Sequence, residues 1–291
     1  MIDLHTHTIC SDGTDEPIEL LKKAEEKGIE ILSITDHNTA KAYEILENIN
    51  VMEYFSGKII PGIELNTKVL GIPIEILGYG IDYKKMNEIL PKKYISAEER
   101  NKIEARVLIE KCIKMGLKVD EKSLDDYDAT YFASKFIQKE ILKYEENVCF
   151  FPEEDLNDLK IFYRKYMSNP NCPLYIEPGD FIPDFDTAAN LIRECDGLVF
   201  IPHIFEYREN SRKILEYILE NHKFDGIECY YTTFTEEQTK ELVSLCKERG
   251  IYMSGGSDYH GKAKLNVELA TGSGNLGISK DIIDDWIKKI K

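Results

Sequence analysis

Histidine residues follow the ends of several predicted strands. Five of the six histidines in the chain occupy such places, namely His5, His7, His37, His203 and His260. In β/α barrels the active site is built from the side chains at the carboxyl ends of the strands and from the loops that follow. Imidazole together with carboxylate suits Zn²⁺, Mn²⁺ or Fe²⁺. This placement therefore predicts a metal centre at one rim of a sheet or barrel.

Three carboxylates lie in the same segments and extend the candidate ligand set. They are Asp12 in the Ser-Asp-Gly-Thr turn, Glu64 in Pro-Gly-Ile-Glu, and Asp258 in Gly-Gly-Ser-Asp-Tyr-His-Gly. A single catalytic metal takes three or four protein ligands. Eight candidate ligands therefore predict at least two metal ions, or three if some carboxylates bridge. The remaining histidine, His222, lies between a predicted helix and a strand, and we expect it on the surface or at a helix end.

Alternating strand and helix patterns position these residues. Strands are predicted over residues 1–4, 29–34, 58–63, 72–77, 197–201, 226–230 and 251–254, with helices over 15–28, 41–54, 187–195, 210–221, 236–249 and 280–291. Repeated strand–helix units are typical of an α/β fold with a parallel sheet or barrel. The segments 84–116, 134–147 and 156–167 look helical and highly charged, without strands between them. We therefore expect a β/α barrel interrupted by an inserted helical subdomain.

The composition of the chain indicates which binding partners and cellular locations to expect. The chain of 291 residues has 37 Lys and Arg against 53 Asp and Glu, a formal net charge of −16. A surface this acidic repels polyphosphate backbones, so we expect no binding to long nucleic acid. No apolar stretch approaches the roughly 18 residues that would cross a bilayer. The start, MIDLHTHT, lacks the features of a signal peptide, and the seven scattered cysteines read as reduced thiols of a cytoplasmic protein.

Six motifs in order give the chain a family resemblance: DLHTHTICSDGTDEP, ILSITDHNT, PGIEL, LVFIPH, DGIECYY and SGGSDYHG. Together they resemble the polymerase and histidinol phosphatase (PHP) family of metal-dependent phosphoesterases. The resemblance implies a distorted TIM-like barrel of seven β/α units, formed here by residues 1–83 and 180–291. Residues 84–179, which resemble the family much less, would then be the inserted, mainly helical cap. It also implies a trinuclear site of manganese, iron or zinc at the mouth of the barrel.

The resemblance also implies how the ligands are shared among the metals. By motif position, the three ligand sets would be His5, His7, Glu64 and Asp258; Asp12, His37 and His260; and Glu64 with His203. The family commonly has a further histidine in a stretch resembling V-H-I-L-G-Y, where this chain has Glu75. If Glu75 is a ligand, its anionic oxygen favours the harder Mn²⁺ or Fe²⁺ over Zn²⁺. The alternative is an unliganded acid beside a weak or absent third metal. We favour coordination because an apolar strand rarely buries an unpaired carboxylate.

Two or three such cations suit the hydrolysis of a phosphate ester. They neutralise phosphoryl oxygens, make a bridging hydroxide available near neutral pH and stabilise the departing alkoxide. We expect Glu64 to bridge metals and Asp12 or His260 to protonate the leaving group. Substrate contacts are predicted for Arg208, as the basic residue that grips phosphate, for Arg100 in the predicted cap, and for Tyr230, which with Tyr231 could stack on a ring. Arg208 could equally be a solvated side chain, and the tyrosines could be packing residues.

The predicted substrate is a small phosphomonoester, such as a nucleotide or a nucleoside bisphosphate. Histidinol phosphate is an alternative substrate within the same class. An amidohydrolase would be a different class of enzyme, but no predicted strand end carries the metal-bridging lysine that those barrels generally use. A metal-stabilised accessory module without catalysis is the non-enzymatic alternative. Metal identity and oligomeric state stay open at this point.

Overall fold

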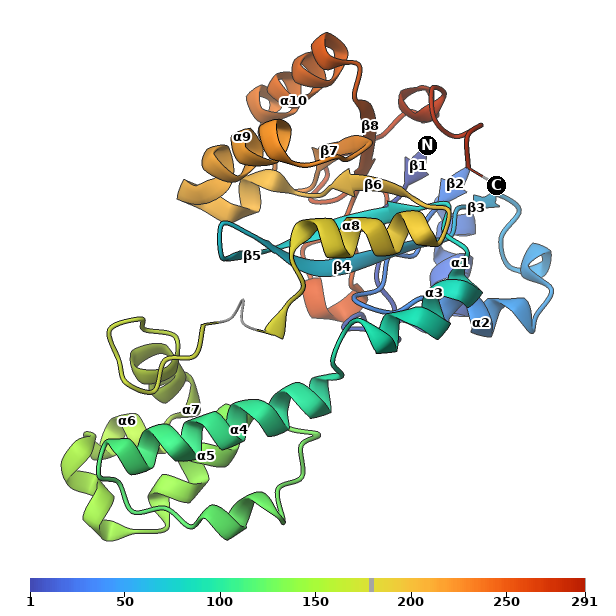
Figure 1. The fold of residues 1–291 in the computed structure, drawn as a ribbon. Helices are drawn as coiled ribbons and strands as arrows, with labels where there is room; N and C mark the ends of the chain where they lie inside the picture. Colours follow the sequence, from blue (N-terminus) through green and yellow to red (C-terminus); the bar gives the residue numbers. More distant parts are fainter. Residues whose placement is uncertain (178–180, 291) are drawn as a thin grey trace. The chain divides into compact units, whose positions relative to one another are not determined.

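The computed structural model describes residues 1–177 and 181–290, which form two compact units. The first unit comprises Met1–Tyr94 and Ile182–Lys291, and the second comprises Ile95–Phe181 (Figure 1). From sequence we place the start of the insertion at residue 84. Helix α3 (Tyr83–Ile89) nevertheless belongs to the first unit, because Met86 and Leu90 are buried in that unit's hydrophobic core.

A small parallel sheet begins the first unit. Its strands lie in the order β1 (Ile2–Asp3), β2 (Ile31–Leu32) and β3 (Lys58–Ile59). Helix α1 (Pro17–Glu26) connects the first two strands and buries Leu20, Leu21 and Ala24 against the core. Proline at the first helical position and a capping box at Glu16 explain where this helix begins. Helix α2 (Lys41–Glu47) follows β2 and is shorter than the predicted 41–54.

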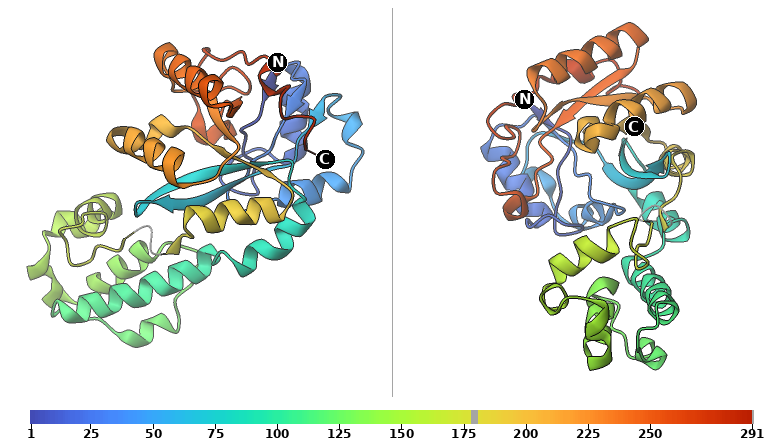
Figure 2. Two further views of the ribbon diagram at one scale, coloured as in Figure 1. Left: turned by 45° about the horizontal axis from the view of Figure 1, so that its top comes forward. Right: turned by 90° about the vertical axis from the view of Figure 1, so that its left-hand side faces the viewer.

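A larger mixed sheet contains the remaining strands. Their order is β4 (Gly62–Val69), β5 (Ile72–Tyr79), β6 (Leu198–Ile201), β7 (Gly226–Tyr231) and β8 (Tyr252–Gly256). The first two form an antiparallel hairpin through Leu70 and Gly71, β5 pairs antiparallel with β6, and the last three strands are parallel. Helices α8 (Phe185–Glu194), α9 (Ser211–Asn221) and α10 (Glu236–Arg249), coloured yellow to orange, accompany this sheet (Figure 2).

The two sheets meet through isolated bridges. Thr6 bridges Tyr259 beyond the ends of β1 and β8, and His37 bridges Glu64 between β2 and β4. A mixed α/β fold is therefore confirmed. The predicted distorted barrel of seven β/α units is not confirmed, because the described strands form one sheet of three strands and one of five, joined by these isolated bridges. A two-residue turn joins β4 to β5, which leaves no room for a crossover helix and makes this pair antiparallel.

The C-terminal segment differs from its predicted helix over 280–291. The described part contains only a 3₁₀ segment, Lys280–Ile283, followed by turns, and Lys291 lies outside the described residues. Tertiary packing holds this segment in place: the buried Trp286 ring stacks on Tyr79 with centroids 5.5 Å apart. The indole N–H also donates to the Met253 carbonyl at 2.8 Å. The C-terminal segment is therefore stabilised by the burial of the Trp286 ring and not by the hydrogen bonds of a regular helix.

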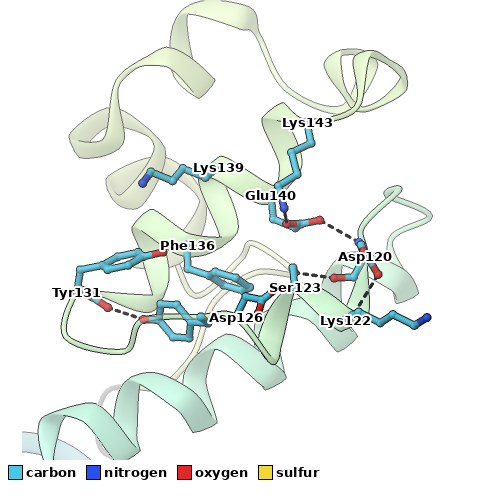
Figure 3. A pocket seen from close by; sticks show the side chains of 10 residues that line it. Asp120, Lys122, Ser123, Asp126, Tyr131, Phe136, Lys139, Glu140 and Lys143 are labelled. Atoms are coloured by element: carbon cyan, nitrogen blue, oxygen red, sulfur yellow. Dashed lines mark hydrogen bonds and ion pairs between the residues drawn. The ribbon is translucent and has the colours of Figure 1, made fainter.

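The second unit is helical and has its own hydrophobic core. Its helices are α4 (Ala97–Lys114), α5 (Ala133–Leu142), α6 (Glu153–Asn157) and α7 (Leu159–Phe162). Leu108, Ile137 and Phe162 are fully buried in that core. A pocket of about 350 Å³ lies on this unit beside α5, with Tyr131 and Phe136 among its lining (Figure 3). Its lysines and acids balance in number, so it presents no net charge to a ligand.

None of the described helices has the length and apolar composition that crossing a lipid bilayer requires. Each of the seven cysteines is a free thiol.

Candidate metal centre

Strand ends of the first unit bring the predicted ligands together. His5 and His7 follow β1, and an extended chain points residues i and i+2 to the same side. Glu64 lies in β4, directly beside His37 through their backbone bridge. Asp258 follows β8 with a φ of 58°. A non-glycine residue in this left-handed region is uncommon and is found where surrounding structure imposes it, often at functional sites.

Glu64 is the centre of the cluster. Its Oε2 lies 3.2 Å from Nε2 of both His5 and His7 and 3.3 Å from Nδ1 of His37. Its Oε1 lies 2.9 Å from Nε2 of His203. The side chain is almost completely buried, with 1% exposed. One carboxylate thus contacts four imidazoles from three different segments of the first unit.

Asp12 and Asp258 hold the other side of the cluster. Asp258 Oδ1 lies 3.3 Å from both His7 Nε2 and His260 Nδ1. Asp12 Oδ1 lies 3.2 Å from His260 Nε2, and Asp12 Oδ2 lies 3.7 Å from His37 Nε2. The side chain of Asp12 is half-exposed, whereas Asp258 is buried. Asp12 therefore forms the solvent side of the cluster.

Glu75 joins the cluster from strand β5. Its carboxylate lies 3.5 Å from His203 Nε2 and 3.9 Å from His37 Nδ1. Three sets of potential ligand atoms lie within 4.8 Å of one another: His7, Asp12, His37 and His260; His5, His7 and Glu64; and His37, Glu64 and Glu75. These sets overlap with the three that the resemblance implies but are not identical to them. Glu64 and Glu75 belong together to the third set, with His37.

The hydrogen bonding of the cluster suits bound cations. Nε2 of His7 and Nδ1 of His37 are buried and lie at ion-pair distance from Glu64 Oε2, but neither nitrogen makes a directed hydrogen bond in the described part of the chain. Ring nitrogens that converge with carboxylate oxygens are the donor set that divalent Mn, Fe or Zn takes. The donor chemistry therefore fits a metal centre. The number and identity of the ions stay predictions.

The pKa values of the histidines also indicate that the cluster suits bound cations. Burial opposes charge on His5, but Glu64, Glu228 and Asp258 outweigh it and raise the pKa of His5 well above its ordinary value. Burial likewise opposes charge on His7 and is outweighed by Asp258 and Glu64, which raise its pKa to about 9. Without a cation, protons on these imidazoles must offset the carboxylates. Bound metal ions would take over that role.

The pKa of Glu75 also indicates that the cluster by itself has too little positive charge for its carboxylates. Burial, followed by the charge of Glu64, raises the pKa of Glu75 to about 7. A carboxylate in this position is costly to ionise unless a cation approaches it. This shift supports the interpretation of Glu75 as a ligand.

Sequence reasoning missed the buried acid Glu228. It lies in β7, where its Oε1 is 3.0 Å from His5 Nδ1 and its Oε2 accepts the His203 backbone N–H at 2.8 Å. Glu228 therefore orients one ligand ring and fixes the backbone of another ligand. The available signal was an acid within the apolar strand sequence DGIECYY, because such an acid must find a partner when the strand is buried.

Replacing Glu228 tests this orienting role. Glu228→Gln should weaken metal binding by about 10- to 100-fold, as is typical for partners that orient ligating histidines. The affinity is measured by titrating chelator-treated protein with Mn²⁺. Glu220→Gln, an exposed change on helix α9, is the matched control. An unchanged affinity in Glu228→Gln would show that His5 needs no such support.

A cavity of about 220 Å³ opens at the cluster. Its described lining comprises Asp12, His37, Glu64, Glu75, His203, Glu206, Tyr207, Tyr231, Asp258, His260 and Lys264. Tyr231 donates a hydrogen bond to Asp258 Oδ2 at 2.7 Å. The hydroxyl of Tyr207 accepts the backbone N–H of Glu75 at 2.9 Å. The two tyrosines thus hold carboxylate-bearing residues at the edge of the cluster.

The predicted substrate residues do not lie in this lining. Arg208 is exposed and has a φ of 52°, which interrupts its 3₁₀ segment, and its neighbour Tyr207 faces the cavity instead. Tyr230 is partly buried and packs beside Gly255 against the hydrophobic core, whereas its neighbour Tyr231 lines the cavity. Arg100 lies in the second unit and pairs with Glu104 at 3.6 Å. Substrate contact by Arg100 stays a prediction.

His222 lies outside the cluster, as expected. It pairs with Asp186 at 2.9 Å on the surface of the first unit. Its ring also packs against Phe185, with centroids 4.5 Å apart.

Comparison with known proteins adds family information to this geometry. A family model described as "PHP domain" matches residues 3–150. A 5'-3' exoribonuclease of Haemophilus influenzae is 27% identical over 98% of each chain. A phosphoribosyl 1,2-cyclic phosphate 1,2-diphosphodiesterase of Eggerthella lenta is 26% identical over 89% of this chain and 94% of the relative. A 3',5'-nucleoside bisphosphate phosphatase of Chromobacterium violaceum is 21% identical over 89% of this chain and 87% of the relative.

One solved structure is similar over nearly the whole chain. It comes from Bifidobacterium adolescentis and was solved as a candidate metal-dependent phosphoesterase. The TM-score is 0.63 at 18% sequence identity, with 99% of this chain and 95% of the other covered. This likeness shows a shared fold.

Proposed function

The chain belongs to the PHP domain family of phosphoesterases, and we propose that its substrates are small phosphorylated molecules. The proposed reaction is metal-dependent hydrolysis of phosphomonoesters such as nucleotides or nucleoside bisphosphates. The observation that carries this proposal is the contact of Glu64 with four imidazoles in a buried cluster that also contains three further acids. A cluster of this kind can hold several cations beside a phosphate group.

The proposed metal ligands are the nine clustered side chains: His5, His7, Asp12, His37, Glu64, Glu75, His203, Asp258 and His260. When bound, two or three divalent ions supply charge neutralisation for the phosphoryl group and a water of lowered pKa. Within the chain, Glu64 keeps the imidazoles converged, and Glu228 and Tyr231 fix the orientation of His5 and Asp258. The chain has a net charge of −16 and would repel an anionic substrate, but bound cations would make the local potential at the cavity favourable for a phosphate.

Asp12 or His260 is the proposed group that passes a proton to the leaving group. Burial opposes charge on Asp12, but the hydrogen bond to His260 and the charge of His37 outweigh it and hold the pKa of Asp12 below its ordinary value. Asp12 is therefore ionised near neutral pH and would first have to take the proton from a water molecule at the cavity. Asp12 Oδ1 and His260 Nε2 lie 3.2 Å apart, within proton-transfer distance. Asp12 is half-exposed at the cavity, so a departing alcohol can approach it from solvent. The pair could move a proton between the cluster and the leaving group.

Metal preference tests the proposed role of Glu75. Replacing the carboxylate by an imidazole in Glu75→His should shift the ratio of bound Mn²⁺ to bound Zn²⁺ severalfold towards zinc, since imidazole is the softer ligand. The ratio is measured by elemental analysis after dialysis against equal concentrations of both ions. Glu53→His, an exposed change in the first unit, is the control. If the ratio does not move, Glu75 is an unliganded acid.

A second candidate function is the cleavage of phosphodiesters. The Haemophilus influenzae relative, matched over 98% of both chains, is named an exoribonuclease. This name conflicts in part with our expectation that the chain avoids long nucleic acid. Acids predominate among the charged groups that line the cavity, which favours a small substrate over a polyanion. A short RNA whose terminal phosphate enters the cavity would satisfy both observations.

A substrate panel with Mn²⁺, and then with chelator, separates these functions. It contains nucleoside monophosphates, a 3',5'-bisphosphate, histidinol phosphate, a cyclic phosphodiester, a 5'-phosphorylated oligoribonucleotide, and amide and lactone substrates. We expect metal-dependent phosphate release, fastest from a small monoester. Faster cleavage of the oligoribonucleotide would replace the first proposal with the second. Hydrolysis of amides or lactones without phosphate release would overturn both, and no turnover at all by metal-loaded protein would favour an accessory module.

A further inference from the structure

The charges that line the cavity are unequally distributed. Apart from the imidazoles, its described lining contains five carboxylates and a single ammonium group, that of Lys264. Bound metal ions would offset the carboxylates of the proposed ligand set, but Glu206 lies in the lining outside that set. A substrate oxygen that does not contact a metal therefore meets one cationic side chain here.

The backbone that carries Lys264 is firmly anchored. Lys264 ends the 3₁₀ segment Gly261–Lys264, directly after the proposed ligand His260. Gly261 has a φ of 62°, and a Cβ there would lie only 2.3 Å from Thr14 Oγ1. The same hydroxyl oxygen accepts the Lys262 backbone N–H at 2.7 Å. The segment thus packs against the loop after β1, while the side chain of Lys264 stays 39% exposed at the cavity.

The bonding of Asp258 leaves Lys264 free to change partners. Asp258 Oδ1 faces the imidazoles, and Oδ2 accepts hydrogen bonds from both Tyr231 and Lys264. Tyr231 is buried, with 6% exposed, and keeps its bond at 2.7 Å. When Lys264 moves away, Oδ2 still has a donor, so no buried acceptor is left unpaired. A long, flexible lysine stem makes such an exchange inexpensive.

We propose that Lys264 is a substrate-binding residue. Its ammonium group would leave Asp258 and bind an oxygen of the substrate phosphate instead. Lys264 thereby takes the role that the sequence suggests for Arg208, whose exposed side chain lies outside the cavity lining. The inference rests on the proposed function, because it requires a phosphate group in the cavity. It adds the cationic contact that the proposed ligand set lacks.

Substitution of Lys264 in the full chain tests the proposal. Lys264→Met should raise both KM for the best phosphate ester and the dissociation constant for inorganic phosphate about tenfold, as loss of one charge-assisted hydrogen bond predicts. The turnover number should change less than about threefold, and metal content should equal that of the wild type. Lys264→Arg should restore most of the phosphate affinity. Lys262→Met, a change in the same turn outside the cavity lining, should have no effect.

Different results would overturn different claims. Loss of bound metal in Lys264→Met, or a fall in kcat at unchanged KM, would make Lys264 a positioning residue for Asp258 and overturn the inference. The dissociation constant for inorganic phosphate is measured on Mn²⁺-loaded protein and needs no turnover. If the wild-type protein binds phosphate no more tightly than Lys264→Met does, the inference is also overturned. A wild-type protein that binds phosphate through Lys264 but hydrolyses no phosphate ester would support the inference and overturn only the proposed function.

Discussion

Glu64→Gln should lower turnover by about a thousandfold or more and should also lower the bound metal. The substitution keeps the shape of the side chain but removes the charge that faces His5, His7, His37 and His203. A neutral amide bridges cations poorly, and loss of a correctly placed metal costs several kcal/mol of transition-state stabilisation. The two readouts are phosphate release with Mn²⁺ and metal content by elemental analysis.

The control for this change is Glu248→Gln, which removes an exposed carboxylate from helix α10. It should leave both readouts unchanged. Activity and metal content near wild-type values in Glu64→Gln would show that another group bridges the metals, and the assignment of Glu64 would be wrong.

Chelator treatment should abolish phosphate release, and added Mn²⁺ should restore it. The ions should also stabilise the fold, because cations that bind only the native state shift unfolding by about 2.7 kcal/mol at a hundredfold excess over Kd. For a chain of this size the expected rise in the unfolding midpoint is about 5 °C or more. It is measured by thermal unfolding with and without Mn²⁺, and Glu64→Gln should show a smaller rise.

Metal uptake should also release protons and tighten as pH rises. Burial opposes charge on His7 and His203, but nearby carboxylates outweigh it and raise the pKa of each to about 9. At pH 7 to 8 these rings therefore carry protons that a metal must displace. A pH indicator in weakly buffered solution detects the release. Metal binding without proton release, or without any stabilisation, would argue against coordination by these histidines.

Local sequence was sufficient to predict most of the candidate ligands. Short β-branched runs mark the strands, and the residues just after them, such as His5, His37 and His203, meet wherever parallel strands end at one edge. The mixed α/β class followed from the same alternation and is confirmed. Because each of these patterns lies within a few consecutive residues, no knowledge of distant contacts was needed.

Other features depend on how strands pair and how side chains pack. The β4–β5 hairpin reverses the chain direction, and the described strands form two sheets where a distorted barrel of seven β/α units was expected. Trp286 holds the C-terminal segment by packing on Tyr79 instead of by helix formation. The partner of Trp286 could not be chosen from local periodicity, because its contact with Tyr79 joins segments far apart in the chain. The hairpin is a local pairing, but the periodicity of residues 64–71 does not mark them as a strand.

The same distinction applies within the candidate site. Residue type and position after a strand pointed to Glu64 and Asp258, whereas Glu228, Tyr231 and Lys264 became relevant only through contacts with those ligands. A ligand has a chemical signature of its own, because few side chains can bind a cation. A supporting residue has none, since its role depends on the direction of its side chain and on the neighbour that folding places within hydrogen-bond distance.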